Sequence, residues 1–286
     1  MLKKILSVVA ASAAVVTMNS AVAHAAPADT VLFGDSFFAN PSYNQVDPRR
    51  VQLSSNVDIG QGSGAPSPQG CPQGERTVGR ELQRISGQRV INYACSAAAA
   101  SADSPRQDFD DQVGHAIRTG ALHPGTKNVL LQFGFNDVAQ TTLLADPNRT
   151  AYRNAARAQV NRIKHAAPNA KITFVSYPAI SAPNGAVCPI RTDGSSRQGF
   201  NVDLGGVVRG VENNINHTMY QASRDTGTHF YDLRKATLAH SMCASDSQRW
   251  ISGAMEYSVP HNLYNHLTHS GITGVANLLN ANVIRY

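Results

Sequence analysis

Two polar side chains suited to acyl transfer follow apolar segments of the chain. Ser36 comes after the apolar residues 31–33 and Gly34, and Asn136 comes after the apolar run 128–133. A serine hydroxyl becomes a nucleophile when a neighbouring base takes its proton, and a side-chain amide can donate a hydrogen bond to an oxyanion. Gly34 allows a sharp turn beneath the serine, although a Gly-Asp-Ser tripeptide alone is also an ordinary turn.

Histidines that could activate such a serine stand near the C-terminus. His261, His266 and His269 lie before the last helical pattern, at spacings of five and three residues. Neutral imidazoles are also common zinc ligands, so a metal site is the alternative interpretation. The chain has no HExxH motif and no acid close to these histidines that could serve as a base. We therefore expect neither a metal nor another cofactor.

The elements that must position these residues alternate between strands and helices. Short, mostly apolar runs predict buried parallel strands; they cover residues 30–33, 89–93, 128–133, 171–176 and 229–231. Apolar residues at helical spacing predict helices between and after these strands; they cover residues 78–85, 109–117, 152–163, 207–222 and 271–279. This alternation predicts an α/β fold, with a parallel sheet between helices and ligands at the carboxyl ends of its strands.

Four short segments together resemble the SGNH hydrolases, also called GDSL esterases/lipases, and more narrowly their secreted actinobacterial members. The segments are residues 34–36, 92–97, 134–137 and 269–274. Their order and spacing are more specific than any one of them, and the resemblance covers nearly all of the mature chain. It implies a three-layer α/β/α sandwich with a central parallel five-stranded sheet, as in flavodoxin-like folds.

The resemblance also implies a role for each matching residue. Ser36 is expected to be the nucleophile and His269, which is followed five residues later by Gly274, the general base. The oxyanion hole is expected to consist of the backbone N–H groups of Ser36 and Ala97 and the side-chain amide of Asn136.

Two positions depart from the family pattern. Ala97 stands where the family usually has a glycine; its N–H is retained, but a positive φ would cost alanine roughly 1 kcal/mol. His266 stands where the family commonly has an aspartate, three residues before His269. An imidazole cannot replace a carboxylate, and some related enzymes use a main-chain carbonyl instead. The resemblance therefore implies a Ser–His dyad in which the backbone carbonyl of His266 orients His269. The alternative is an acid from elsewhere in the chain, for which the sequence offers no candidate.

The first residues predict export from the cell. Lys3 and Lys4 precede an apolar stretch at residues 5–16, and Ala23-His24-Ala25 supplies a signal-peptidase pattern. We expect residues 1–25 to be a signal peptide and residues 26–286 to form one secreted, extracellular SGNH hydrolase domain.

The four cysteines all lie in the mature chain, and none forms a CxxC motif. In an exported protein an even number of cysteines indicates disulfides. Four cysteines permit three pairings, of which we expect nearest-neighbour pairing, Cys71–Cys95 with Cys188–Cys243.

The charge of the chain limits the kinds of molecule that it is expected to bind. The formal charge is +6, of which the signal peptide carries two units, and the sequence has no Lys/Arg block of the kind that binds nucleic acid. We expect a monomer that acts on an ester or lipid substrate, with a mildly basic surface suited to the cell envelope.

These residues predict a secreted serine esterase or lipase that hydrolyses carboxylic esters through an acyl-enzyme on Ser36. Two alternatives remain open. Transfer of the acyl group to a cell-envelope sugar or lipid uses the same intermediate, and a wall-binding protein could retain the fold with a degraded site.

Overall fold

The computed structural model describes residues 27–46, 64–101, 107–140, 149–191, 200–202 and 206–285. The predicted signal peptide, residues 1–25, lies outside the described residues.

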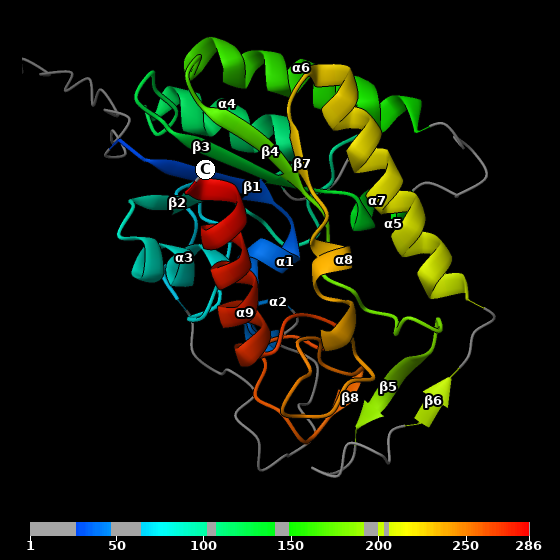
Figure 1. The fold of residues 1–286 in the computed structure, drawn as a ribbon. Helices are drawn as coiled ribbons and strands as arrows, with labels where there is room; N and C mark the ends of the chain where they lie inside the picture. The colour runs from blue at the N-terminus through cyan, green and yellow to red at the C-terminus, as the bar shows by residue number, and fades with distance from the viewer. Residues whose placement is uncertain are drawn as a thin grey trace, which may run out of the picture.

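A five-stranded parallel sheet forms the centre of the molecule (Figure 1). Its strands are β1 (Thr30–Gly34), β2 (Val90–Asn92), β3 (Asn128–Gln132), β4 (Lys171–Val175) and β7 (His229–Tyr231). The strand order is β2-β1-β3-β4-β7, and every neighbouring pair is parallel. All five strands agree with the sequence-based prediction, and the order reverses beside β1, where open α/β sheets bind ligands.

Helices cover both faces of this sheet, which confirms the predicted three-layer fold. The long helices are α3 (Val78–Ser86), α4 (Phe109–Arg118), α6 (Thr150–Ala166), α7 (Val207–Thr226) and α9 (His269–Leu279). Helices α4 and α6 pack together over one face, and α3 and α9 pack together over the other (Figure 1). Side-chain caps begin two of these helices: the Thr77 hydroxyl accepts from the backbone N–H of Arg80, and the Thr268 hydroxyl accepts from that of Gly271.

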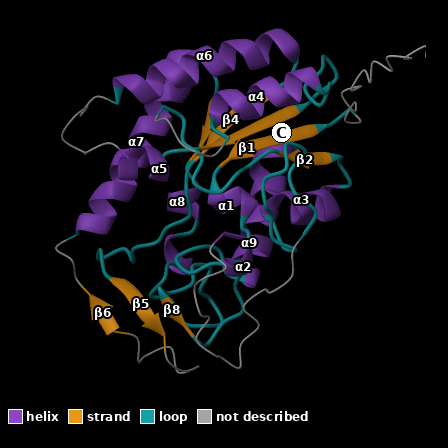
Figure 2. Cartoon of the chain, turned by 180° about the vertical axis from the view of Figure 1, so that it is seen from behind, coloured by secondary structure: helices purple, strands orange, loops and turns teal. Residues whose placement is uncertain are grey.

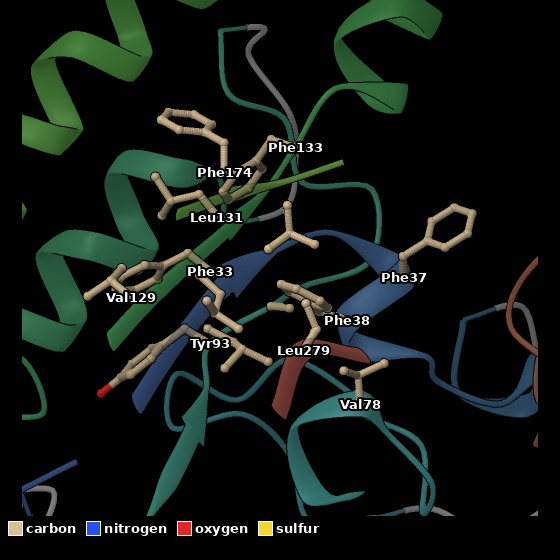
Figure 3. Close-up of a cluster of buried hydrophobic side chains, with 14 of the residues drawn as sticks. Phe33, Phe37, Phe38, Val78, Tyr93, Val129, Leu131, Phe133, Phe174 and Leu279 are labelled. Carbon is tan, nitrogen blue, oxygen red and sulfur yellow. The ribbon is translucent and has the colours of Figure 1, made fainter. Parts of the chain in front are cut away.

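Aromatic and aliphatic side chains from the sheet form a continuous core with the flanking helices (Figure 3). Phe33 of β1 and Leu131 of β3 are completely buried, and the ring of Phe109 on α4 stacks on that of Phe133 at a centroid distance of 4.6 Å. Burying each such side chain contributes about 1.5–3 kcal/mol to the free energy of folding. The strand ends that carry the polar residues are therefore anchored in a tightly packed layer.

Short elements beyond the main sheet were not predicted from the sequence. The short helices are α1 (Ser36–Ala39), α2 (Tyr43–Val46), α5 (Phe135–Gln140), α8 (Leu233–Ala236), η1 (Leu238–His240) and η2 (Asn280–Ile284). A second sheet, in the order β6-β5-β8, joins β5 (Val187–Arg191), β6 (Phe200–Val202) and β8 (Met255–Glu256). Figure 2 shows this sheet apart from the main one, at the other end of the molecule.

Both predicted disulfides are present. Cys71 and Cys95 join the segment before α3 to the loop after β2, with a Cα–Cα distance of 5.3 Å. Cys188 and Cys243 join β5 to the loop after η1, with a Cα–Cα distance of 5.0 Å. Among the helices in the described part of the chain, none has the length and apolar character needed to cross a membrane.

Candidate active site

Ser36 lies at the carboxyl end of β1, as predicted, and is the first residue of α1. The side chain of Asp35 caps this short helix by accepting a hydrogen bond from the backbone N–H of Phe37 at 3.0 Å. Gly34 does not have a positive φ, so our conformational reason for this glycine is wrong. Its role is steric, because a Cβ there would lie 2.9 Å from the carbonyl oxygen of Gln132 on the neighbouring strand.

The imidazole next to Ser36 belongs to His266. Its Nε2 lies 2.8 Å from the Ser36 Oγ, and its Nδ1 lies 2.8 Å from the backbone carbonyl oxygen of Tyr264. A carbonyl can only accept a hydrogen bond, so Nδ1 of the ring must carry a proton. In the neutral imidazole Nε2 is then an acceptor aimed at the serine hydroxyl, which is the arrangement that a general base requires.

The surroundings of His266 favour its neutral form. The ring stacks on that of Phe37 at a centroid distance of 4.7 Å and an interplanar angle of 29°. Burial lowers the pKa of His266 below its usual value of 6.5, against the opposing effect of the hydrogen bond to Tyr264. The imidazole is therefore ready to accept a proton at neutral pH.

The prediction that His269 is the partner of Ser36 is wrong. His269 begins α9, and its Nε2 lies 3.1 Å from the side-chain oxygen of Asn262. The Asn262 amide in turn donates to the backbone carbonyl of Asn40 at 2.7 Å. His269 thus belongs to a link between the start of α9 and the end of α1.

The predicted role of the His266 carbonyl is also wrong. This oxygen accepts hydrogen bonds from the backbone N–H of Ser252 at 2.9 Å and from the Ser252 hydroxyl at 3.1 Å, so it anchors the loop. A backbone carbonyl does orient the histidine next to the nucleophile, but it belongs to Tyr264 and the histidine is His266.

The sequence signal that pointed to His269 applies equally to His266. The family pattern of a histidine followed five residues later by glycine fits His266 with Gly271 as well as it fits His269 with Gly274. Both glycines pack against Trp250: a Cβ at Gly271 would lie 2.3 Å from the Trp250 carbonyl oxygen, and one at Gly274 would lie 2.3 Å from its ring. The glycines therefore reflect helix packing and do not distinguish the two histidines.

Asn136 comes from the first turn of α5, at the end of β3. Its side-chain nitrogen donates to the backbone carbonyl of Ala98 at 2.8 Å and lies 3.5 Å from the Asp35 carboxylate. The structure therefore brings Asn136 to the same edge of the sheet as Ser36, and it also ties Asn136 to the loop that contains Ala97.

Ala97 is exposed and has a φ of 64°, so the left-handed conformation is required where the family usually has glycine. Two buried or half-buried carboxylates anchor this loop. Asp108 accepts from the backbone N–H of Ala99 at 2.8 Å, and Asp137 accepts from that of Ser101 at 2.7 Å. These hydrogen bonds offset the unfavourable backbone conformation of the alanine.

The Asp35 carboxyl lies completely buried beneath Ser36. Burial raises its pKa to about 7, whereas the hydrogen bonds from the Tyr177 hydroxyl and the backbone N–H of Phe37 act in the opposite direction. The negative charge of Asp137 raises the Asp35 pKa further.

The three C-terminal histidines each contact a different group. His261 is buried, with its Nδ1 2.9 Å from the carbonyl oxygen of Val259, whereas His266 faces Ser36 and His269 faces Asn262. Among the described residues, no three His, Cys, Asp or Glu side chains are grouped so that they could hold a metal ion.

Comparison with known families agrees with this arrangement. The sequence profile of the GDSL-like lipase/acylhydrolase family matches residues 32–271. The chain belongs to this family. The match begins within β1, just before Ser36, and ends within the first turn of α9, so it includes both members of the Ser36–His266 pair.

Solved structures similar to this GDSL-like chain include a phospholipase and a lipase from Streptomyces. Phospholipase A1 from Streptomyces albidoflavus is 18% identical, with a TM-score of 0.57 over 90% of this chain and 100% of that chain. The extracellular lipase from Streptomyces rimosus is 17% identical, with a TM-score of 0.51 over 89% of this chain and 99% of that chain. At these identities the likeness supports the fold. Among curated proteins, none matches the chain.

Proposed function

We propose that this GDSL-family protein is a serine esterase that hydrolyses carboxylic esters, with Ser36 as the nucleophile and His266 as the general base. The observation that carries the proposal is the 2.8 Å contact between the Ser36 Oγ and the His266 Nε2 at the carboxyl edge of the sheet. A nucleophile and a base within hydrogen-bond reach, with the base oriented by a third group, are the signature of nucleophilic acyl transfer.

The reaction has two balanced halves. In the first, His266 takes the Ser36 hydroxyl proton through Nε2 while Oγ attacks the ester carbonyl carbon, and the protonated imidazole then gives that proton to the departing alcohol. In the second, His266 takes a proton from water, the resulting hydroxide attacks the acyl-enzyme, and the proton returns to Ser36 as the acid leaves.

The oxyanion formed in each half needs hydrogen-bond donors. We assign this role to the backbone N–H groups of Ser36 and Ala97 and to the side-chain amide of Asn136. Their support is positional: Asn136 contacts both Asp35, next to Ser36, and Ala98, next to Ala97. Because an amide has two donor hydrogens, Asn136 exchanges one of these two contacts for the oxyanion in the reaction. Preorganised donors of this kind typically supply a large share of the catalysis of acyl transfer.

Tyr264 takes the place that an aspartate has in a triad. Its backbone carbonyl fixes the tautomer and orientation of His266 but carries only a partial negative charge. It therefore stabilises the protonated imidazole less than a carboxylate would. The burial that lowers the pKa of His266 acts in the same direction, so the imidazolium is a short-lived species in this site.

We also propose that the esterase works outside the cell. The sequence pattern of a signal peptide and the two disulfides, Cys71–Cys95 and Cys188–Cys243, support this location. An extracellular lipase from Streptomyces rimosus has a similar fold.

The direct test is hydrolysis of p-nitrophenyl esters by the mature protein and by Ser36→Ala. We expect turnover by the wild type and a loss of about 10⁴-fold or more in kcat for the variant, because no other group replaces the nucleophile. An unchanged melting temperature would show that the variant is folded. Turnover by Ser36→Ala at the wild-type rate would refute the proposal.

A further inference from the structure

The hydroxyl of Tyr177 lies beneath the site, where it contacts two turns that come from different strands. Tyr177 follows β4 and is only 4% exposed. Its hydroxyl donates a hydrogen bond to the Asp35 carboxylate and accepts one from the backbone N–H of Phe135 at 3.4 Å. Asp35 immediately precedes Ser36, and Phe135 immediately precedes Asn136.

This one hydroxyl therefore connects the segments that carry two of the proposed oxyanion donors. The connection continues on both sides, because Asp35 caps α1 through the N–H of Phe37 and lies 3.5 Å from the Asn136 amide. A movement of either turn away from the other would break a hydrogen bond of Tyr177.

We propose that Tyr177 is a positioning residue, whose hydroxyl fixes the Asn136 amide relative to the turn of Ser36. The inference rests on the proposed esterase function and deepens it, because it adds a residue that acts on the oxyanion hole without touching the substrate.

Aromatic packing fixes the ring that carries this hydroxyl. The Tyr177 ring makes edge contacts with Phe37, at a centroid distance of 5.0 Å, and with Phe135, at 4.4 Å. Phe37 and Phe135 flank Ser36 and Asn136 in the sequence, so the ring contacts the same two turns as the hydroxyl. Substitution by phenylalanine keeps these ring contacts and removes only the oxygen.

Asp35 explains why the hydroxyl matters. Its carboxyl is surrounded by donors from Phe37, Tyr177 and Asn136, an arrangement that favours the ionised form. The Tyr177 hydrogen bond lowers the pKa of Asp35 against the effect of burial. Without the hydroxyl, more of the Asp35 carboxyl is protonated near neutral pH and it accepts less well from the Asn136 amide.

The test is a double-mutant cycle on kcat and KM for p-nitrophenyl ester hydrolysis, using Tyr177→Phe, Asn136→Ala and the double variant. Loss of one oxyanion donor costs about 10²–10³-fold in kcat, so misplacing that donor in Tyr177→Phe should cost about tenfold with KM nearly unchanged. In the Asn136→Ala background the effect of Tyr177→Phe should shrink to less than about twofold, because the residue acts through Asn136.

Tyr93→Phe is the matched control. Tyr93 is also completely buried and its hydroxyl lies 2.9 Å from that of Thr119, but it contacts neither Asp35 nor Phe135. This control should lose stability without the loss in kcat, and equal losses in Tyr93→Phe and Tyr177→Phe would overturn the inference.

Two further outcomes separate the inference from the function it rests on. An undiminished effect of Tyr177→Phe in the Asn136→Ala background would overturn the inference alone, whereas an inactive wild type would overturn the proposed function. If Tyr177→Phe does not fold, Asp35→Asn tests the same link, because it removes the carboxylate that accepts from Tyr177 and Asn136. A loss in kcat for Asp35→Asn that disappears in the Asn136→Ala background supports the inference, and a persistent loss overturns it.

Discussion

The two halves of the site are built in different ways. Ser36 and Asn136 lie at the ends of neighbouring strands β1 and β3, so the register of the sheet sets how far apart they are. His266 lies in a long loop that precedes α9 and has little regular structure. The nucleophile and the amide are thus placed by the core, and the base is placed by hydrogen bonds within its own loop.

Those hydrogen bonds are mostly buried and join residues within the segment that precedes and begins α9. Ser252 donates to the carbonyls of His266 and Leu263, and Thr268 donates through its hydroxyl to the carbonyl of Arg249. Arg249 and Glu256 form a completely buried ion pair. Removal of one partner of such a pair typically costs about 3–5 kcal/mol, because the other charge is left buried and uncompensated.

Substitution of each histidine in turn shows which one the loop places as the base. We expect His266→Ala to lower kcat for p-nitrophenyl ester hydrolysis by about 10⁴-fold, because Ser36 then has no base. We expect His269→Ala, the matched control three residues away, to lower kcat by less than about tenfold, since it only weakens the link through Asn262. The reverse ranking of the two variants would restore His269 as the base.

The pH dependence of kcat/KM distinguishes the titration of His266 from that of Asp35. His266 accepts a proton only when neutral, and burial lowers its pKa, so kcat/KM should fall about tenfold per pH unit below a midpoint that lies under 6.5. Asp35 lies near Tyr177, Asp137 and Tyr152 and has a pKa of about 7. Its titration should add only a shallow shoulder to the kcat/KM profile near that pH.

The Tyr177→Phe variant sharpens this pH test. Its missing hydroxyl normally lowers the Asp35 pKa, so the shoulder should move to higher pH while the steep limb of His266 stays in place. A steep limb centred above pH 7 in the wild type would contradict the lowered pKa of His266.

The parallel sheet and the residues at its carboxyl edge could be predicted well from the sequence. A strand-length apolar run locates each strand, and its end locates the residues that lie at the edge. The strands that end at Gly34 and Gln132 could be recognised locally, and the residues after them had to share an edge. The choice between His266 and His269 could not be made locally, because both satisfy the same glycine spacing. It depends on hydrogen bonds to Ser252 and Tyr264, which no periodic pattern encodes.

The second sheet was missed for a similar reason. Strands β5 and β8 come from segments more than 60 residues apart, and β8 has only two residues. The two strands pair over only two residue positions, Ile190 with Met255 and Arg191 with Glu256, and a pattern of apolar residues cannot reveal such a long-range pairing.

A smaller effect, on stability, is expected at Ala97, which lies in the loop tied to Asn136. Its φ of 64° is unfavourable for alanine, so Ala97→Gly should raise the free energy of unfolding, by up to about 1 kcal/mol after the greater flexibility of glycine in the unfolded chain is subtracted. Urea denaturation would measure this change. A decrease in stability would show that the left-handed conformation is not strained here.

The pairing of Ser36 with His266 is tested most directly by labelling the mature protein with a fluorophosphonate and mapping the modified peptide. The structure predicts that the wild type and His269→Ala are labelled at Ser36 and that His266→Ala is labelled at least about 10²-fold more slowly, because the serine lacks its base. Labelling at another residue, or equally fast labelling of Ser36 in His266→Ala, would contradict this account.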